Sequence, residues 1–139
     1  MTSAKIISTG RYVPEKCVPN AYFNEKYDKD IDTWLRENVG IETRHFASED
    51  EVASDLAVNA AKQALDRADV AVKDVDLLIV ATDTPDYLSP ATASVVQYKM
   101  GLVNAGVFDI NNACAAFVSG AITSSKYLAT EPRRYKKAL

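Results

Sequence analysis

The sequence predicts an α/β fold in which helices cover both faces of a mostly parallel sheet, and two observations support this. Residues 77–81 and 107–110 are apolar at nearly every position, as in strands that are buried on both faces. Stretches with helical character precede, separate and follow these runs, and such alternation is typical of parallel strands joined by helical crossovers. With 139 residues, the chain is long enough to bury the core of one ordinary domain.

In the first third of the chain we expect one strand and two short helices. Residues 4–9 form a β-rich segment. After a loop, Asn20 is the predicted N-cap of a short helix over residues 20–27. A second helix is expected within residues 30–39, and Gly40 suits the left-handed residue that ends it.

The clearest helix follows these two. Ser48 and Glu51 fit a capping box, in which two side chains satisfy backbone N–H groups at the start of a helix. Small and apolar side chains then recur at helical spacing on one face: Ala53, Ala57, Ala60, Ala61, Ala64, Leu65 and Ala68. Because alanine is small, we expect this helix to pack very close to its neighbour, and we assign it no chemistry.

The remaining elements bring two segments to the same edge of the sheet. Strand 77–81 leads into a loop over residues 82–88, and a helix over residues 89–101 has a proline in its first turn. Strand 107–110 leads directly to Cys114. Functional sites in such sheets gather at the carboxyl ends of the strands, so the loop and Cys114 are expected to share a cleft.

Cys114 stands between its strand and an apolar helix that ends near Ala129. The unpaired N–H groups of a helix N-terminus favour the thiolate form, which makes a thiol a usable nucleophile. The neighbouring Ala113, Ala115 and Ala116 leave room for a substrate carbonyl and leave backbone N–H groups accessible as oxyanion donors. A structural cysteine is the alternative, because free cysteine is among the most buried residue types.

Composition narrows the possible partners. The formal net charge of −3 gives no support for a nucleic-acid partner. No apolar run is long enough to span a bilayer, and the apolar stretch at the N-terminus is too short for a signal peptide. Cys17 and Cys114 lie far apart and, with a single histidine, match no disulfide framework and no metal-binding spacing. We therefore expect a cytoplasmic protein without a metal, in which Cys17 has no role.

Three segments resemble a known family. They are Trp34–Phe46 (WLRENVGIETRHF), Thr82–Ala91 (TDTPDYLSPA) and Asp109–Gly120 (DINNACAAFVSG). In their order and spacing they resemble the N-terminal half of β-ketoacyl-acyl-carrier-protein synthase III, a condensing enzyme of the thiolase superfamily. The resemblance implies a thiolase-like layered α-β-α fold.

The resemblance also implies a mechanism. A cysteine matched by Cys114 takes an acyl group from acyl-CoA as a thioester. A malonyl group on acyl carrier protein then loses carbon dioxide, and the resulting carbanion attacks the acyl-enzyme. This reaction initiates fatty acid or polyketide synthesis in a homodimer without a cofactor. The acyl chain length, the pathway and the carrier of the extender stay open.

Three further residues match positions that contact substrate in the family. Trp34 matches the residue that stacks on the adenine of CoA, which suits a large π-face, and a core tryptophan is the alternative. Asn38 stands where many bacterial relatives have an arginine near the CoA phosphates. Ser89 falls where the family tends to place a bulkier gate of the partner subunit's acyl tunnel, so a longer or branched acyl group is expected to fit.

The family's catalytic histidine and asparagine belong to its C-terminal half. His45 matches another position, and we expect it to be a hydrogen-bonded structural side chain. Residues 1–139 are therefore expected to be an N-terminal thiolase-like domain that stops before its last strand and cannot condense alone. The absent half is expected in a longer or a second chain. Two alternatives stay open, a thiolase-fold acyltransferase that does not condense and a non-catalytic thiolase-fold partner subunit.

Overall fold

The computed structural model describes residues 4–139, which form two compact units. The small unit is Val13–Glu51. The layered unit consists of residues 4–12 together with residues 52–139. Each unit contains a two-stranded sheet of its own.

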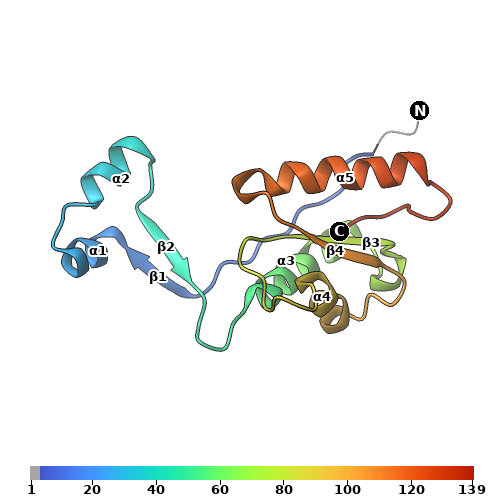
Figure 1. Ribbon diagram of the computed structural model, residues 1–139, viewed down its shortest axis with the longest axis horizontal. Coiled ribbons are helices and arrows are strands. Elements are labelled where there is room, and N and C mark those ends of the chain that lie inside the picture. The colour runs from blue at the N-terminus through green and yellow to red at the C-terminus, as the bar shows by residue number, and fades with distance from the viewer. Residues whose placement is uncertain (1–3) are drawn as a thin grey trace. The chain divides into compact units, whose positions relative to one another are not determined.

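The layered unit is built on two parallel strands, β3 (Leu77–Ala81) and β4 (Gly106–Ile110). Helix α5 (Ala116–Thr130) covers one face of this sheet, and α3 (Ala53–Ala68) and α4 (Thr92–Met100) lie on the other face (Figure 1). This arrangement confirms the predicted layered α/β fold with parallel strands and helices on both faces.

Both faces of β3 contribute to the core of the layered unit. Leu77 and Leu78 are consecutive and so point to opposite faces, yet they are only 1% and 3% exposed. Leu78 joins a buried cluster with Val58 of α3 and Val96 of α4. The unbroken apolar run predicted this burial of both faces. Two 3-10 turns, Val72–Asp74 and Ala113–Ala115, precede β3 and α5 respectively.

The expected strand over residues 4–9 is wrong, because none of these described residues belongs to a strand. A strand needs a hydrogen-bonded neighbouring strand. This segment lies along α3 instead, where the Ser8 hydroxyl donates to the Ala64 carbonyl at 2.7 Å. The Arg67 guanidinium of the same helix donates to the Thr9 carbonyl at 2.8 Å.

Gly10 allows this N-terminal segment to approach α3 very closely. A Cβ atom at Gly10 would stand 2.0 Å from the carbonyl oxygen of Ala60 and 2.7 Å from the backbone nitrogen of Ala64. Only a residue without a side chain fits there. The close packing expected of the alanine face is therefore found, with the N-terminal segment as the neighbour.

Helix α3 begins at Ala53 rather than behind the expected capping box. Glu51 Oε2 does accept the N–H of Ser48 at 3.0 Å, but within a turn that precedes the helix. At the actual start, Asp55 Oδ2 accepts the N–H of Val52 at 3.2 Å. Because a valine side chain cannot accept a hydrogen bond, the second half of a capping box does not form.

The small unit contains β1 (Lys16–Pro19), α1 (Asn20–Tyr27), α2 (Asp32–Asn38) and β2 (Thr43–Phe46). The two strands pair in antiparallel fashion, and neither was predicted from the sequence. Both helices were predicted. The left-handed residue after α2 is also confirmed, because Gly40 has a φ of +72°.

Asn20 is the first residue of α1 rather than its N-cap. Its side chain is 1% exposed and donates to Asp32 Oδ1 at 2.8 Å and to the Ile41 carbonyl at 2.7 Å. Its amide oxygen accepts a hydrogen bond from Arg44 at 2.6 Å. The hydrogen bond from Asn20 lowers the pKa of Asp32. Asn20 therefore joins both helices to β2 instead of capping one helix.

Candidate active site

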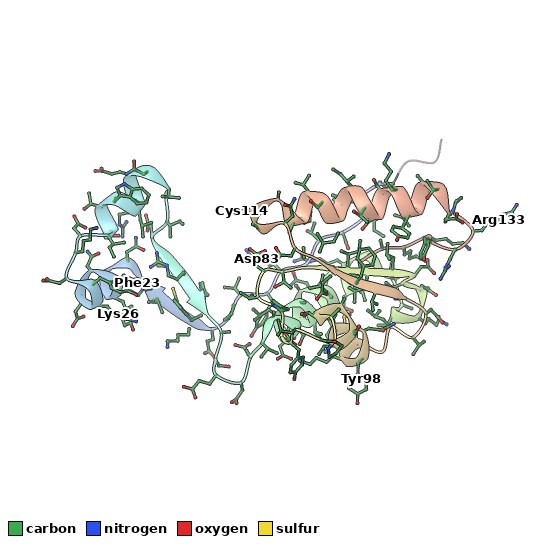
Figure 2. All side chains as sticks on the ribbon, viewed as in Figure 1. Phe23, Lys26, Asp83, Tyr98, Cys114 and Arg133 are labelled. Atoms are coloured by element: carbon green, nitrogen blue, oxygen red, sulfur yellow. The ribbon has the colours of Figure 1, made fainter. Side chains whose placement is uncertain are left out.

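Cys114 lies between β4 and α5, within the short turn Ala113–Ala115 (Figure 2). Its thiol is free and exposed. The strand–turn–helix pattern predicted this location at the carboxyl end of a parallel strand. The alternative role as a buried structural cysteine does not fit an exposed side chain.

Two asparagines hold the turn that presents Cys114. Asn111 Oδ1 accepts the N–H of Ala113 at 3.3 Å, and Asn112 Nδ2 donates to the Ser119 hydroxyl of α5 at 2.9 Å. Ala113 has a φ of +43°, a left-handed conformation that costs an L-residue with a Cβ atom roughly 1 kcal/mol. The strained residue directly precedes Cys114, so the backbone itself sets the direction of the thiol-bearing turn.

The backbone donors around Cys114 are only partly available to a ligand. The N–H of Ala115 donates to the Asn112 carbonyl at 3.0 Å, and the N–H of Ala116 donates to the Ala113 carbonyl. The expectation that these alanines offer oxyanion donors is therefore corrected. These bonds do not engage the N–H of Cys114. Among the described amides of this turn, it is therefore the donor available to an oxyanion.

The loop after β3 leaves the sheet beside the Cys114 turn, as the sequence predicted. Ala81 and Ile110, the last residues of β3 and β4, are register partners. The N–H of Thr82 continues this pairing by donating to the Ile110 carbonyl at 3.2 Å. Asp83 of the loop and Cys114 accordingly lie at the same end of the layered unit (Figure 2).

Ser89 is exposed and precedes α4, which begins at Thr92 rather than at residues 89–90. The start of the helix is fixed by Asp109 of β4. Its two carboxylate oxygens accept the N–H groups of Thr92 and Ala93, both at 2.7 Å. Asp109 was not among the residues for which the sequence predicted a role. The available signal was a lone acid inside an apolar strand, because a half-buried carboxylate needs hydrogen-bond donors.

Lys99 of α4 joins its helix to the start of α3. Its Nζ donates to the Ser54 hydroxyl at 2.7 Å and to Asp55 Oδ1 at 2.6 Å. The hydrogen bond from Lys99 and, after it, the one from the Val52 N–H lower the pKa of Asp55. This ion pair fastens together the two helices that cover one face of the sheet.

Trp34 and Asn38 lie one helical turn apart on α2 of the small unit. The indole is 59% exposed, which does not fit the alternative of a core tryptophan. Asn38 Nδ2 donates to the Trp34 carbonyl at 2.9 Å. The sequence-predicted site residues thus form two groups, Cys114 with Ser89 in the layered unit and Trp34 with Asn38 in the small unit.

His45 has the expected structural hydrogen bond, from its Nδ1 to the Pro14 carbonyl in the small unit. Within residues 4–139, no three His, Cys, Asp or Glu side chains gather as they would around a metal ion. None of the helices in this range combines the length and the apolar character that crossing a membrane requires.

A cavity of about 620 Å³ opens along the other edge of β3, and Cys114 does not line it. Its walls include residues 4–10, the alanine face of α3 and one side of α5. Leu139 begins to pair with β3 there, since its N–H donates to the Leu77 carbonyl and its carbonyl accepts from the Ile79 N–H, both at 2.9 Å. The candidate active site lies at the carboxyl ends of the strands, where the Cys114 turn follows β4.

The solved structures that the chain matches assign its layered fold, with a cysteine at a strand–helix turn, to the thiolase-like α/β class. No protein-family model matches the chain. It is 44% identical over 132 residues to β-ketoacyl-[acyl-carrier-protein] synthase III of Geobacillus kaustophilus, covering 95% of this chain and 42% of that protein. The crystal structure of the same enzyme from Thermus thermophilus matches with a TM-score of 0.87 at 35% identity, covering 97% and 41%. The priming β-ketosynthase of the R1128 polyketide pathway matches with a TM-score of 0.82 at 28% identity, covering 89% and 37%.

In sequence and fold, the chain corresponds to the N-terminal half of β-ketoacyl-acyl-carrier-protein synthase III. The resemblance drawn from the three sequence segments is confirmed. The chain spans less than half of the length of the relatives it matches, 42% of the Geobacillus protein.

Proposed function

We propose that Cys114 is the nucleophile that accepts an acyl group from acyl-CoA. The observation that carries this proposal is an exposed thiol in the turn between a parallel strand and a helix, at the carboxyl end of the strand. The thiolate attacks the thioester carbonyl carbon, a new C–S bond forms, and CoA leaves as a thiolate that takes up a proton. The N–H of Cys114 is the donor on this chain for the oxyanion of the tetrahedral intermediate.

The whole protein, on this proposal, catalyses decarboxylating condensation of the acyl group with malonyl-acyl carrier protein. The names of the relatives support this assignment, as initiation of fatty acid synthesis or as priming of a polyketide. The resemblance assigns the decarboxylating histidine and asparagine to the C-terminal half of the family, and His45, whose Nδ1 bonds the Pro14 carbonyl, does not match the catalytic histidine. The chain alone therefore loads an acyl group but does not condense it, and the complete enzyme is a cytoplasmic homodimer that needs no cofactor.

Trp34 and Asn38 of the small unit and Ser89 of the layered unit are each proposed to contact acyl-CoA, as the resemblance implies. The exposed indole of Trp34 offers a face on which the adenine of CoA stacks. Asn38 would contact the phosphates with its amide rather than with the charge of an arginine, which predicts a weaker phosphate contact. The small side chain of Ser89 supports a wide acyl tunnel.

Further polypeptide is proposed to fill the cavity beside β3. Leu139 pairs with one side of β3, and the alternation of that ladder makes the Ile79 carbonyl and the Ala81 N–H its next bonding groups. The walls on both sides are mainly apolar, which suits a strand covered on both faces. This supports the assignment of residues 1–139 to an N-terminal thiolase-like domain that other polypeptide completes.

The test uses the natural polypeptide that contains this sequence, incubated with acetyl-CoA and analysed by intact mass and peptide mapping. Cys17 is also exposed and provides the matched control. We expect the acyl adduct to disappear in Cys114→Ser and to persist in Cys17→Ser. An adduct that survives Cys114→Ser would refute the proposal.

A second measurement separates the proposed reaction from its alternatives. Release of carbon dioxide from malonyl-acyl carrier protein by the acylated enzyme is the expected result. Acylation without this release would instead favour an acyltransferase that does not condense. A Cys114 thiol that reacts with iodoacetamide no faster than Cys17 would favour a non-catalytic partner subunit.

A further inference from the structure

The start of α4 is held by a residue of the strand that leads to Cys114. Asp109 of β4 accepts the N–H groups of Thr92 and Ala93, each at 2.7 Å, with one carboxylate oxygen for each donor. Both donor residues are fully buried. A carboxylate at a helix N-terminus forms charge-assisted bonds and interacts favourably with the helix dipole. Asp109 therefore fixes the first turn of α4 to β4.

A second acid, Asp86, attaches the middle of the loop that precedes α4. The N–H of Asp86 donates to the Thr92 hydroxyl at 3.2 Å, and Asp86 Oδ1 accepts the N–H of Ser54 in α3 at 2.9 Å. Thr92 thus takes part in both attachments, with its N–H bound to Asp109 and its hydroxyl bound to Asp86. The loop is tied to β4 through one buried threonine.

Residues 87–90, between the two attachments, are exposed. Leu88 is fully exposed and Tyr87 is 60% exposed, although both are apolar or aromatic. Ser89 follows them directly. Ser89 is the residue that is proposed to border the partner subunit's acyl tunnel, so a displacement of residues 87–91 is expected to change which acyl groups that tunnel admits.

We propose that Asp109 is a positioning residue that, through Thr92, holds residues 86–91, with the proposed gate residue Ser89, in place and thereby sets which acyl groups the partner subunit's tunnel admits. This inference rests on the proposed acyl transfer to Cys114. Asp109 touches the loop attachment and not the thiol. Its loss is therefore expected to change acyl selectivity while the intrinsic reactivity of Cys114 persists.

The experiment uses the natural polypeptide that contains this sequence, carrying Cys17→Ser so that every adduct reports Cys114. Rate constants for S-acylation by acetyl-CoA and by decanoyl-CoA give a selectivity ratio. We expect Asp109→Asn and Thr92→Val to change this ratio at least fivefold. Thr92→Ser, which keeps the hydroxyl, and Asp83→Asn, which removes an exposed acid from the same loop, should stay within twofold.

Two further readouts separate positioning from general stability. In Asp109→Asn, amide hydrogen exchange over residues 84–91 should be at least tenfold faster than in the wild type, while exchange in β3 is unchanged. The rate of Cys114 alkylation by iodoacetamide should stay within twofold of the wild-type rate. If the wild type is not acylated on Cys114 by either CoA, the proposed function fails. If it is acylated but both disruptive variants keep the wild-type ratio, the positioning role alone is refuted. Should Asp109→Asn not fold, the contrast between Thr92→Val and Thr92→Ser decides.

Discussion

Replacing Gly10 with alanine should detach the N-terminal segment from α3. The new Cβ atom would stand 2.0 Å from the Ala60 carbonyl oxygen, and the helix backbone cannot move far enough locally to relieve this clash. The segment must move away, which breaks the bonds from Ser8 to the Ala64 carbonyl and from Arg67 to the Thr9 carbonyl. At about 1 kcal/mol for each net hydrogen bond, the free energy of unfolding should fall by about 2 kcal/mol.

The assay is urea unfolding followed by far-ultraviolet circular dichroism, with Gly106→Ala as the matched control. A Cβ atom at Gly106 would meet its nearest neighbour, the Tyr135 hydroxyl, at 3.8 Å, which is ordinary contact. The control should therefore stay within about 0.5 kcal/mol of the wild type or be slightly more stable. Equal stabilities for Gly10→Ala and Gly106→Ala would refute the close approach of the segment to α3.

Four further outcomes are expected. Trp34→Ala should raise the KM for acyl-CoA about tenfold and Trp34→Phe much less, in initial-rate assays, because stacking of one base contributes about 1–3 kcal/mol. The hydrogen bond from Lys99 holds the pKa of Asp55 below its ordinary value of 3.8. The stabilisation from this pair is therefore complete above that value and is lost as the pH falls through the folded pKa. In urea unfolding over that pH range, Asp55→Asn should lose less stability than the wild type. Asn20→Ala should destabilise the small unit by about 2–4 kcal/mol, seen in the fluorescence of the single tryptophan, because three hydrogen bonds of a buried side chain are lost. Ala113→Val should lower thermal stability while Ala113→Gly stays near the wild type, because a β-branched residue tolerates φ +43° least.

The parts of the fold that the sequence predicted correctly are those that local patterns determine. The run at residues 77–81 is apolar on consecutive positions, and only a strand covered on both faces buries such a pattern. The position of Cys114 followed from the same reasoning, since an apolar strand and an apolar helix must be joined by a short turn. These inferences needed no knowledge of what packs against the segment.

The strands that were missed or misplaced depend on distant partners. Residues 16–19 become strand β1 only because residues 43–46 lie beside them, and neither segment has a distinctive apolar pattern. Residues 4–9 have the composition of a strand, but in this chain they lie along α3 without strand pairing. Strand identity is a property of the pair, so composition alone assigned the wrong segment.

The two misplaced helix starts have one physical cause. The rules for helix starts consider the residues just before the helix, yet α3 and α4 receive acceptors from elsewhere in the chain. The Ser54 N–H of α3 is bound by Asp86 of the loop, and the Thr92 N–H of α4 is bound by Asp109 of β4. Non-local acceptors of this kind couple the elements they join, so a change at either helix start reaches the loop beside Cys114. The bonds that the local rules did not predict are therefore the ones that hold the loop with Ser89 in place.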